Sequence, residues 1–267
     1  MSGAAALAQL RQDRHVSASS LDGYLRCPEQ YAHRYLRHTP PAHRAGALGF
    51  GTAIHVALAT FYRHLVRVEE SPVEELHQLF ADTWHRELEH PVPVLLDDND
   101  TEDSLLSKGL EMLSVFHEKI ERPHKVLDVE APFAVQIEDP TTGEVLPKLV
   151  GIFDAVIEDA DGGQHVLEHK SSKVRWTVDR LAYDHQITSY SLAAPLMGLG
   201  EADVKIQVLL KQKKADLEVY TTRRTAQDHR ELLQVIRGVT TAIDAGAFYP
   251  VRDWHCRGCG FAHRCLL

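Results

Sequence analysis

Two apolar runs joined by a short polar turn constrain the fold of this chain more than any other feature of its sequence. The first extends from Leu149 to Ile157 and the second from Gln164 to Lys170. Between them, Asp159-Ala160-Asp161-Gly162-Gly163 is typical of a hairpin turn. Because the partners of a hairpin are adjacent in a sheet, the sequence predicts two neighbouring antiparallel strands near the centre of the fold.

Three charged side chains stand near the ends of these predicted strands. Asp154 follows the apolar residues 149–153, and the second run leads into Glu168-His169-Lys170. Side chains alternate along a strand, so Glu168 and Lys170 share a face, within reach of Asp154. Two carboxylates can hold a divalent cation, and the ammonium group adds positive charge beside whatever that cation binds. The arrangement suits hydrolysis of a phosphodiester, although Glu-x-Lys alone is a weak signal because charged residues are common at strand ends.

The remaining patterns predict an α/β protein. Apolar residues recur at helical spacing in several stretches before residue 125 and again over 178–197 and 226–245, whereas 126–137, 204–210 and 218–222 resemble strands. No internal repeat or flexible linker interrupts them, so we expect residues 1–267 to form one domain. Its expected parts are N-terminal helices (17–65), a helical insertion (66–125), the nuclease-like core (126–222), and a C-terminal helix with a cysteine-rich tail (223–267).

Charge and hydropathy restrict the function further. The formal net charge of −9 argues against general affinity for nucleic acid unless basic residues cluster and metal ions offset the site carboxylates. Basic residues do gather in four groups: Arg26, Arg34, Arg37 and Arg44; Lys170, Lys173 and Arg175; Lys205, Lys211, Lys213 and Lys214; and Arg252, Arg257 and Arg264. The N-terminal apolar run is too short for a signal peptide, and no run approaches a membrane span, so we expect a cytoplasmic protein.

The chain has four cysteines, Cys27, Cys256, Cys259 and Cys265. Three of them form Cys-x2-Cys-x5-Cys, and the fourth lies far upstream. Disulfides are uncommon in cytoplasmic proteins, and none of the four cysteines is left over from a possible shared site. Four thiolates brought together suit either Zn²⁺ or an iron–sulfur cluster.

Further candidates are ordinary when each is considered alone. His55 is one of 17 histidines, and Gln186 and Tyr190 are four residues apart on one face of a predicted helix. In chain order, however, Gly51-x3-His55, Gly151-x2-Asp154, Glu168-x-Lys170 and Gln186-x3-Tyr190 resemble the motif series of the RecB-type branch of the PD-(D/E)xK nucleases. The resemblance extends from Ser17 to Cys265.

The resemblance implies a mixed central sheet flanked by helices, and a role for each matched residue. The proline that gives the superfamily its name is absent, since Gly151-Ile152-Phe153 precedes Asp154, as is usual in this branch. Glu130 is an additional candidate, because some members place another site acid in the strand before the aspartate. The implied metal ligands are His55, Asp154, Glu168 and the backbone carbonyl of His169; Lys170 is the implied catalytic lysine, and Gln186 and Tyr190 lie beside the substrate strand.

The cysteines resemble those of the iron–sulfur subgroup of this branch, which includes AddB and the CRISPR-adaptation nucleases. In that subgroup a [4Fe–4S] cluster ties the N-terminal segment to the tail, and Ser19-Ser20-Leu21 and Tyr24 before Cys27-Pro28 match as well. The resemblance favours [4Fe–4S] over zinc and implies a structural role for the cluster.

Together these features predict a Mg²⁺- or Mn²⁺-dependent DNA nuclease, in particular a single-strand exonuclease acting in DNA repair or recombination, phage or CRISPR-adaptation processing. Stacking of an unpaired strand on Tyr190 or Trp176 is a further expectation. No Gly-x4-Gly-Lys-Ser/Thr motif is present, so a helicase motor or a CRISPR integrase would be a separate partner. Structure-specific cleavage and RNA substrates remain alternatives, as does a DNA-end-binding scaffold whose nuclease site is dispensable.

Overall fold

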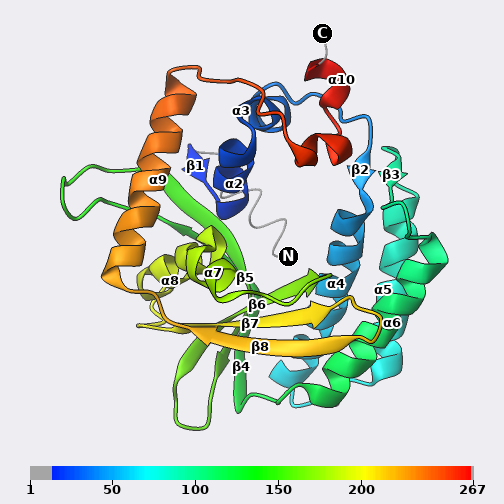
Figure 1. Ribbon diagram of the computed structural model, residues 1–267. Helices are drawn as coiled ribbons and strands as arrows, with labels where there is room; N and C mark the ends of the chain where they lie inside the picture. Colours follow the sequence, from blue (N-terminus) through cyan, green and yellow to red (C-terminus); the bar gives the residue numbers. More distant parts are fainter. Residues whose placement is uncertain (1–13, 266–267) are drawn as a thin grey trace.

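A mixed sheet forms the centre of the computed structural model, which describes residues 14–265 (Figure 1). Within these residues the sheet has six strands in the order β1-β5-β6-β7-β8, and β4 pairs with the other edge of β5. The predicted hairpin is confirmed, because β5 and β6 pair antiparallel. The strands of this sheet are β1 (His15–Val16), β4 (Lys125–Val135), β5 (Lys148–Glu158), β6 (Gln164–Ser172), β7 (Asp203–Leu210) and β8 (Asp216–Thr222).

Helices cover both faces of this sheet (Figure 1). The arrangement confirms the predicted α/β class with a mixed central sheet flanked by helices. A small parallel pair, β2 (Arg44–Ala45) and β3 (Val94–Leu95), lies outside it. One face carries α4 (Gly46–Val66), α5 (Val73–Leu88) and α6 (Glu102–Lys119), and the other carries α2 (Ala18–Arg26), α8 (His185–Leu196) and α9 (Ala226–Asp244).

Strands β6 and β7 run parallel and are joined by a crossover that contains two helices. The sequence predicted one helix over 178–197, but the crossover holds α7 (Val178–Tyr183) and α8 in succession. Asp184 separates them with φ −72° and ψ 117°, and its side chain accepts hydrogen bonds from the backbone N–H groups of Gln186 and Ile187. Aspartate is a strong N-cap, so it starts a new helix here instead of continuing the old one.

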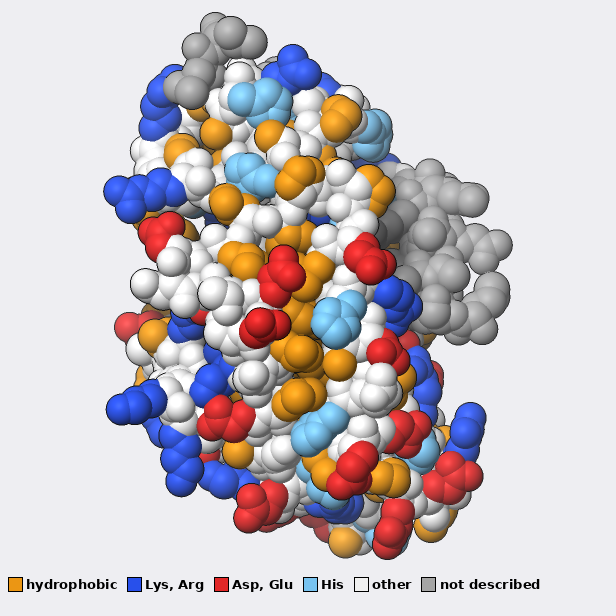
Figure 2. All heavy atoms as spheres, turned by 90° about the vertical axis from the view of Figure 1, so that its right-hand side faces the viewer, with side chains coloured by type: hydrophobic (Ala, Val, Ile, Leu, Met, Phe, Trp, Pro, Cys, Tyr) orange, Lys and Arg blue, Asp and Glu red, His pale blue; other side chains and the backbone are white. Residues whose placement is uncertain are grey.

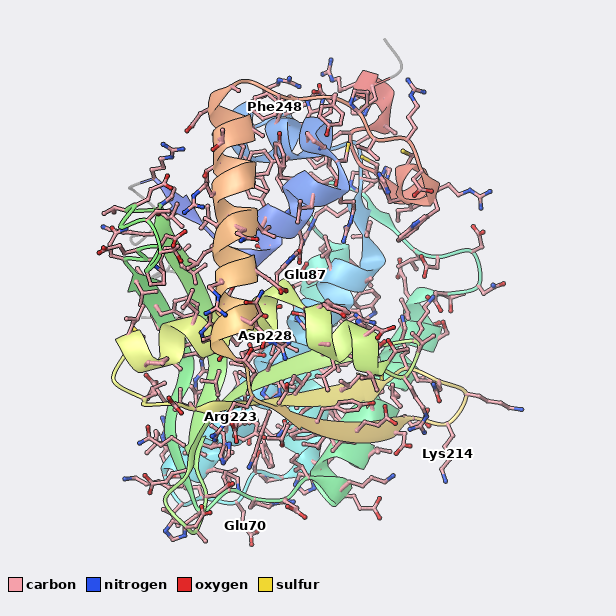
Figure 3. All side chains as sticks on the ribbon, turned by 60° about the vertical axis from the view of Figure 1, so that its left-hand side comes forward. Glu70, Glu87, Lys214, Arg223, Asp228 and Phe248 are labelled. Atoms are coloured by element: carbon pink, nitrogen blue, oxygen red, sulfur yellow. The ribbon has the colours of Figure 1, made fainter. Side chains whose placement is uncertain are left out.

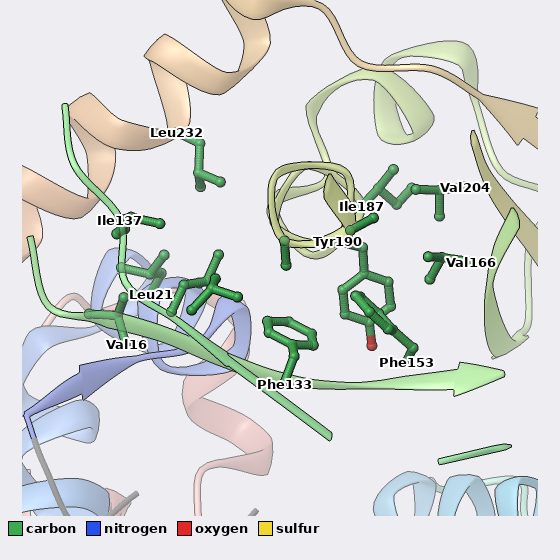
Figure 4. Packing of buried hydrophobic residues seen from close by; sticks show 14 of the residues in the cluster. Val16, Leu21, Phe133, Ile137, Phe153, Val166, Ile187, Tyr190, Val204 and Leu232 are labelled. Atoms are coloured by element: carbon green, nitrogen blue, oxygen red, sulfur yellow. The ribbon is translucent and has the colours of Figure 1, made fainter. Parts of the chain in front are cut away.

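The face with α2, α8 and α9 buries an aromatic core (Figure 4). Phe133 of β4 stacks on Phe153 of β5 at 4.6 Å between ring centroids, and Tyr190 of α8 meets Phe153 edge-on at 5.0 Å. Burying such rings removes a large apolar area from water, which fixes α8 against β5. This contact matters for the site, because α8 carries Gln186.

The opposite face buries a second core, built by α4 together with α5 and α6 of the predicted insertion. Phe80 of α5 contacts Phe50 of α4 edge-on at 5.4 Å between ring centroids. A Cβ added to Gly109 of α6 would lie 2.0 Å from the ring of Phe80, so only glycine allows these helices to approach so closely. The same cluster includes Ala155 and Leu167 from the sheet, and α4 contacts both strands of the hairpin.

The tail after α9 returns to the N-terminal helices. Phe248 lies four residues beyond the end of α9 (Figure 3), and the hydroxyl of Tyr24 donates to the carbonyl of Ala247 at 2.7 Å. The backbone N–H of Glu29 donates to Tyr249 at 3.1 Å, so the tail passes over α3. The elements that this contact joins are α3 (Pro28–Tyr31), a π-helical turn (Ala32–Leu36), a 3-10 turn (Trp254–Gly258) and α10 (Ala262–Cys265).

The surface is unevenly charged. In Figure 2 the upper part of the molecule, where α3 and the tail lie, displays Lys, Arg and His side chains but few Asp or Glu. Residues 26–44 and 250–265 contain seven arginines and only two acidic residues, although the whole chain carries −9. Among the helices of residues 14–265, none is long and apolar enough to cross a membrane. The N-terminal run considered for a signal peptide lies outside the described residues.

Candidate active site

Strands β5 and β6 bring the charged residues of the hairpin together. Asp154 directly precedes Ala155, and Glu168 directly follows Leu167, its partner in the last β5–β6 pair. Both residues therefore lie inside their strands and not near the strand ends, contrary to the expectation from the sequence. The backbone N–H of His169 donates to Asp154 Oδ2 at 2.7 Å, and Lys170 forms an ion pair with the carboxylate of Glu168. The structure therefore places Asp154, Glu168 and Lys170 at one point, as the sequence predicted; their chemical roles stay predictions.

The glycine before Asp154 is explained by packing. Gly151 lies opposite Phe133 in the β4–β5 ladder, and a Cβ at this position would come within 2.4 Å of the Phe133 ring. A side chain here would push the ring away and disturb the strand that carries Asp154. Glycine thus lets the aromatic core lie directly beneath the site strand.

Helix α4 supplies the histidine. His55 Nδ1 lies 3.2 Å from Asp154 Oδ1, while the neighbouring Ile54 and Leu58 are fully buried and hold the helix against the sheet. Gly51 lies one turn before His55 and therefore on the same helix face. No heavy atom lies within 4 Å of a Cβ built on Gly51, so this face of α4 is open beside the histidine.

Helix α8 supplies the predicted glutamine and tyrosine. Lys170 Nζ donates to Gln186 Oε1 at 2.6 Å, and Gln186 Nε2 donates to the hydroxyl of Tyr190 at 2.8 Å. The Tyr190 hydroxyl in turn donates to the carbonyl of Ile152. Both Tyr190 and Trp176 are buried, at 4% and 6% exposure, so neither offers an exposed ring face, contrary to the expectation of stacking.

Three residues around the site were missed in the sequence. Asp184, the N-cap of α8, raises the pKa of Lys170 together with Glu168, and its position before a helical pattern was the available signal. Tyr62 and Gln207 form a buried hydrogen bond, and the Tyr62 ring stacks on that of His169 at 5.3 Å. Nothing local in the sequence marks Tyr62 or Gln207, because their contact joins residues far apart in the chain.

Burial and mutual charge displace the pKa values of the site groups in opposite directions. Burial, and then the negative charge of Asp154, raise the pKa of Glu168 to about 7. Burial lowers the pKa of His55, but the adjacent Asp154 carboxylate outweighs burial and raises it to about 9. The pKa of Asp154 falls despite burial, because His55 lies beside it. Burial lowers the pKa of His169 to about 4, so its ring is neutral near pH 7.

The donor set fits a hard divalent cation. Glu168 is only 1% exposed, and its Oε2 has no hydrogen-bond partner among the described residues, which is costly for a carboxylate. Two adjacent carboxylate groups and one imidazole suit Mg²⁺ or Mn²⁺. Among residues 14–265, no group of three or more His, Cys, Asp or Glu side chains yet converges closely enough to hold one ion. Instead, Lys170 and His55 provide the positive charge beside the carboxylates.

Glu130 lies next to the site but has its own partner. It falls between the β4 residues that pair with Phe153 and Ala155, and therefore opposite Asp154. Its side chain forms an ion pair with Arg63 of α4. Its backbone has φ 52°, a left-handed conformation that is strained for a non-glycine residue and is often found at functional sites.

The four cysteines gather between α3 and the tail. All four are free thiols and line one cavity, together with Gln30. Burial, followed by the charges of Cys259, Cys27 and Cys256, raises the pKa of Cys265, which places the four sulfur atoms in one another's field. Gln30 Nε2 lies 3.3 Å from Cys259 Sγ. The cavity thus joins an N-terminal cysteine to the three of the tail.

Comparisons with known proteins identify a family and similar folds. The sequence profile of the PD-(D/E)XK nuclease superfamily matches residues 15–266. A crystal structure from Eubacterium rectale, provisionally named an exonuclease, has a TM-score of 0.54 and 14% identity, covering 90% of this chain and 84% of that one. Another, designated SSO0001, has a TM-score of 0.45 and 14% identity, covering 98% of this chain and 91% of that one. No curated protein matches the chain.

Proposed function

The chain belongs to the PD-(D/E)XK nuclease superfamily, and from this premise we propose that it is a Mg²⁺- or Mn²⁺-dependent deoxyribonuclease of the RecB type. Its proposed activity is exonucleolytic cleavage of single-stranded DNA. The observation that carries the proposal is the meeting of Asp154, Glu168 and Lys170 where the pairing of β5 with β6 ends, with a buried Glu168 oxygen that lacks a hydrogen-bond partner among the described residues.

Each site residue has a proposed task. His55, Asp154, Glu168 and the His169 carbonyl would hold the divalent cation, which when bound neutralises the phosphodiester and makes water a better nucleophile. Lys170 is proposed as the catalytic lysine, since its ammonium group can hydrogen-bond the attacking water or the phosphate where negative charge develops. Gln186 holds Lys170 in place through the 2.6 Å hydrogen bond, and Tyr190 supports Gln186 from the core.

We propose a [4Fe–4S] cluster for the cysteine cavity. Four free thiols from both ends of the chain line it, which supports a shared group over unrelated cysteines. Four thiolates suit either Zn²⁺ or an iron–sulfur cluster, so iron, sulfide and zinc analysis of the purified protein tests the proposal. When bound, the cluster would tie α3 to the tail.

The substrate is proposed to approach from the arginine-rich end of the molecule. That end contains residues 26–44 and 250–265, in which seven arginines outnumber two acidic residues. Phosphates attract such surfaces regardless of base sequence. We propose a single nuclease domain with residues 66–125 as its helical insertion, acting in DNA repair or recombination, phage or CRISPR-adaptation processing, alone or with a helicase or integrase partner.

The proposal is tested by digesting single-stranded DNA that carries a label at either end. Anaerobically purified protein is incubated with Mg²⁺, Mn²⁺ or EDTA, beside Lys170→Ala. Lys205→Ala is the matched control, because Lys205 pairs with Asp159 on the same sheet and touches none of the site carboxylates. Wild type and Lys205→Ala should cleave with metal only, and Lys170→Ala should lose activity by about 100-fold or more.

The products from each label give the polarity of cleavage. A wild-type protein that is folded and contains its cluster, yet leaves DNA intact with either metal, contradicts the nuclease proposal and supports a DNA-end-binding scaffold. If Lys170→Ala cleaves DNA at the wild-type rate, the proposed catalytic role of Lys170 is wrong.

A further inference from the structure

The crossover segment between the two halves of the site exposes apolar side chains. Residues 173–184, here called the crossover segment, connect Lys170 of β6 to Gln186 of α8, and none of the residues of α7 is buried. Val178 is 83% exposed and Tyr183 is 75% exposed, and Val174 is 60% exposed. Large apolar side chains so exposed, and so close together in one short segment, are typical of a contact surface.

The crossover segment is nevertheless held firmly. Trp176 is buried, and the guanidinium group of Arg180 lies over its ring at 4.3 Å from the centroid. The carbonyl of Leu181 accepts a hydrogen bond from Arg224 at 2.6 Å. The exposure of Val178 and Tyr183 is therefore a fixed feature of the surface.

Tyr183 lies close in the chain to the helix that carries Gln186. It directly precedes Asp184, which caps α8 by accepting a hydrogen bond from the backbone N–H of Gln186 at 2.9 Å. Tyr183 is thus three residues before Gln186, whose side chain contacts Lys170. No other exposed tyrosine adjoins this site among residues 14–265, since Tyr62 and Tyr190 are buried and Tyr249 belongs to the tail.

Of the three cations in the crossover segment, Arg180 lies over the Trp176 ring, and the other two form ion pairs. Lys173 Nζ lies 2.5 Å from Asp97 Oδ2, and Arg175 lies 3.0 Å from Asp216 Oδ2. What the segment offers a passing strand is thus apolar and aromatic surface, which suits nucleobases better than phosphates. In a duplex the base faces are covered by their neighbours, so only an unpaired strand can use the Tyr183 ring.

We propose that Tyr183 stacks on an unpaired nucleobase of the DNA strand whose phosphate lies at Lys170. This inference rests on the proposed nuclease function and adds a reason for single-strand preference. Val174 and Val178 extend the same apolar surface along the strand. Because stacking does not depend on base identity, the contact selects unpaired DNA without reading its sequence.

The test compares Tyr183→Ala and Tyr183→Phe with wild type on three substrates of equal length: oligothymidylate, a strand with abasic spacers, and blunt duplex. Tyr249→Ala is the matched control, because Tyr249 is also an exposed tyrosine, at 56%, but lies in the tail. Tyr183→Ala should lower kcat/KM on oligothymidylate by about 5- to 100-fold. Tyr183→Phe and Tyr249→Ala should keep wild-type rates, and the abasic strand and the duplex should not distinguish Tyr183→Ala from wild type.

An equal loss on normal and abasic strands, or no loss at all, overturns the stacking proposal. If wild type cleaves none of the substrates, the nuclease proposal is contradicted. The stacking proposal is then tested by DNA binding alone. Fluorescence anisotropy with labelled oligothymidylate in Ca²⁺ should still show tighter binding by wild type than by Tyr183→Ala, with no such difference on the abasic strand. Equal binding of oligothymidylate by wild type and Tyr183→Ala contradicts the stacking proposal.

Discussion

At the scale of single residues, Gly51 is a position where the demands of activity and of stability differ. It lies inside α4, where glycine weakens a helix, and no atom stands within 4 Å of its missing Cβ. Packing therefore does not require glycine at this position, but the open helix face beside His55 gives a reason for it. A DNA strand approaching the site would need that space, because it must bring a phosphate close to His55 and Asp154.

We expect Gly51→Ala to stabilise the protein by about 0.5–1 kcal/mol and to lower nuclease activity by about 10-fold. Gly238→Ala is the matched control, since Gly238 lies inside α9 and is equally open. It should give the same gain in the free energy of unfolding with unchanged activity. Urea unfolding and strand digestion measure the two effects. Full activity in Gly51→Ala would show that substrate does not use this face.

At the scale of secondary-structure elements, an ion pair joins the N-terminal helices to the site helix. His185 Nδ1 at the start of α8 lies 2.6 Å from Asp22 Oδ1 of α2. The hydrogen bond that the His185 ring donates to Asp22 is the main reason that the pKa of His185 is raised. The folded protein thus holds this proton more tightly than the unfolded chain, so the contribution is fully present below the unfolded pKa and is lost as the pH rises through the folded pKa.

Asp22→Asn should therefore destabilise the protein more at about pH 6 than at about pH 9, by roughly 0.5 kcal/mol because the pair is partly exposed. Asp244→Asn is the control: Asp244 pairs with Arg14 at 2.6 Å, and arginine keeps its charge at both pH values. Its effect on urea unfolding should not change with pH. A pH-independent loss in Asp22→Asn would contradict the role given to His185.

Elements were predictable from the sequence where local pattern decides them. The β5–β6 hairpin follows from apolar runs joined by a glycine-rich turn, and helical spacing of apolar residues before residue 125 agrees with α4, α5 and α6. The two-helix crossover was not predicted, because the cap at Asp184 lies within an otherwise continuous helical pattern. The burial of Tyr190 could not be foreseen either, since it depends on Phe133 and Phe153 meeting in the core. Local spacing placed the site carboxylates but gave no access to such distant contacts.

At the scale of the whole molecule, the cysteine cavity links the two ends of the described chain. If a [4Fe–4S] cluster occupies it, Cys27→Ser should reduce iron from about four atoms per chain to almost none. The melting temperature should fall by about 5 °C or more, since each kcal/mol corresponds to about 2–4 °C in a chain of this size. Iron, sulfide and zinc analysis with anaerobic thermal melts measures both. One zinc and no iron in wild type would contradict the cluster.

The position of the cysteines also sets an order in time. Cys256, Cys259 and Cys265 follow Cys27 by about 230 residues, and ribosomes add about 5–20 residues per second. The three tail cysteines are therefore synthesised roughly ten to fifty seconds after Cys27. The sheet and its helices lie between these positions and can fold first. The cavity is consequently the last part of this molecule to be assembled, and if it holds the proposed cluster, delivery of iron and sulfide would have to follow translation.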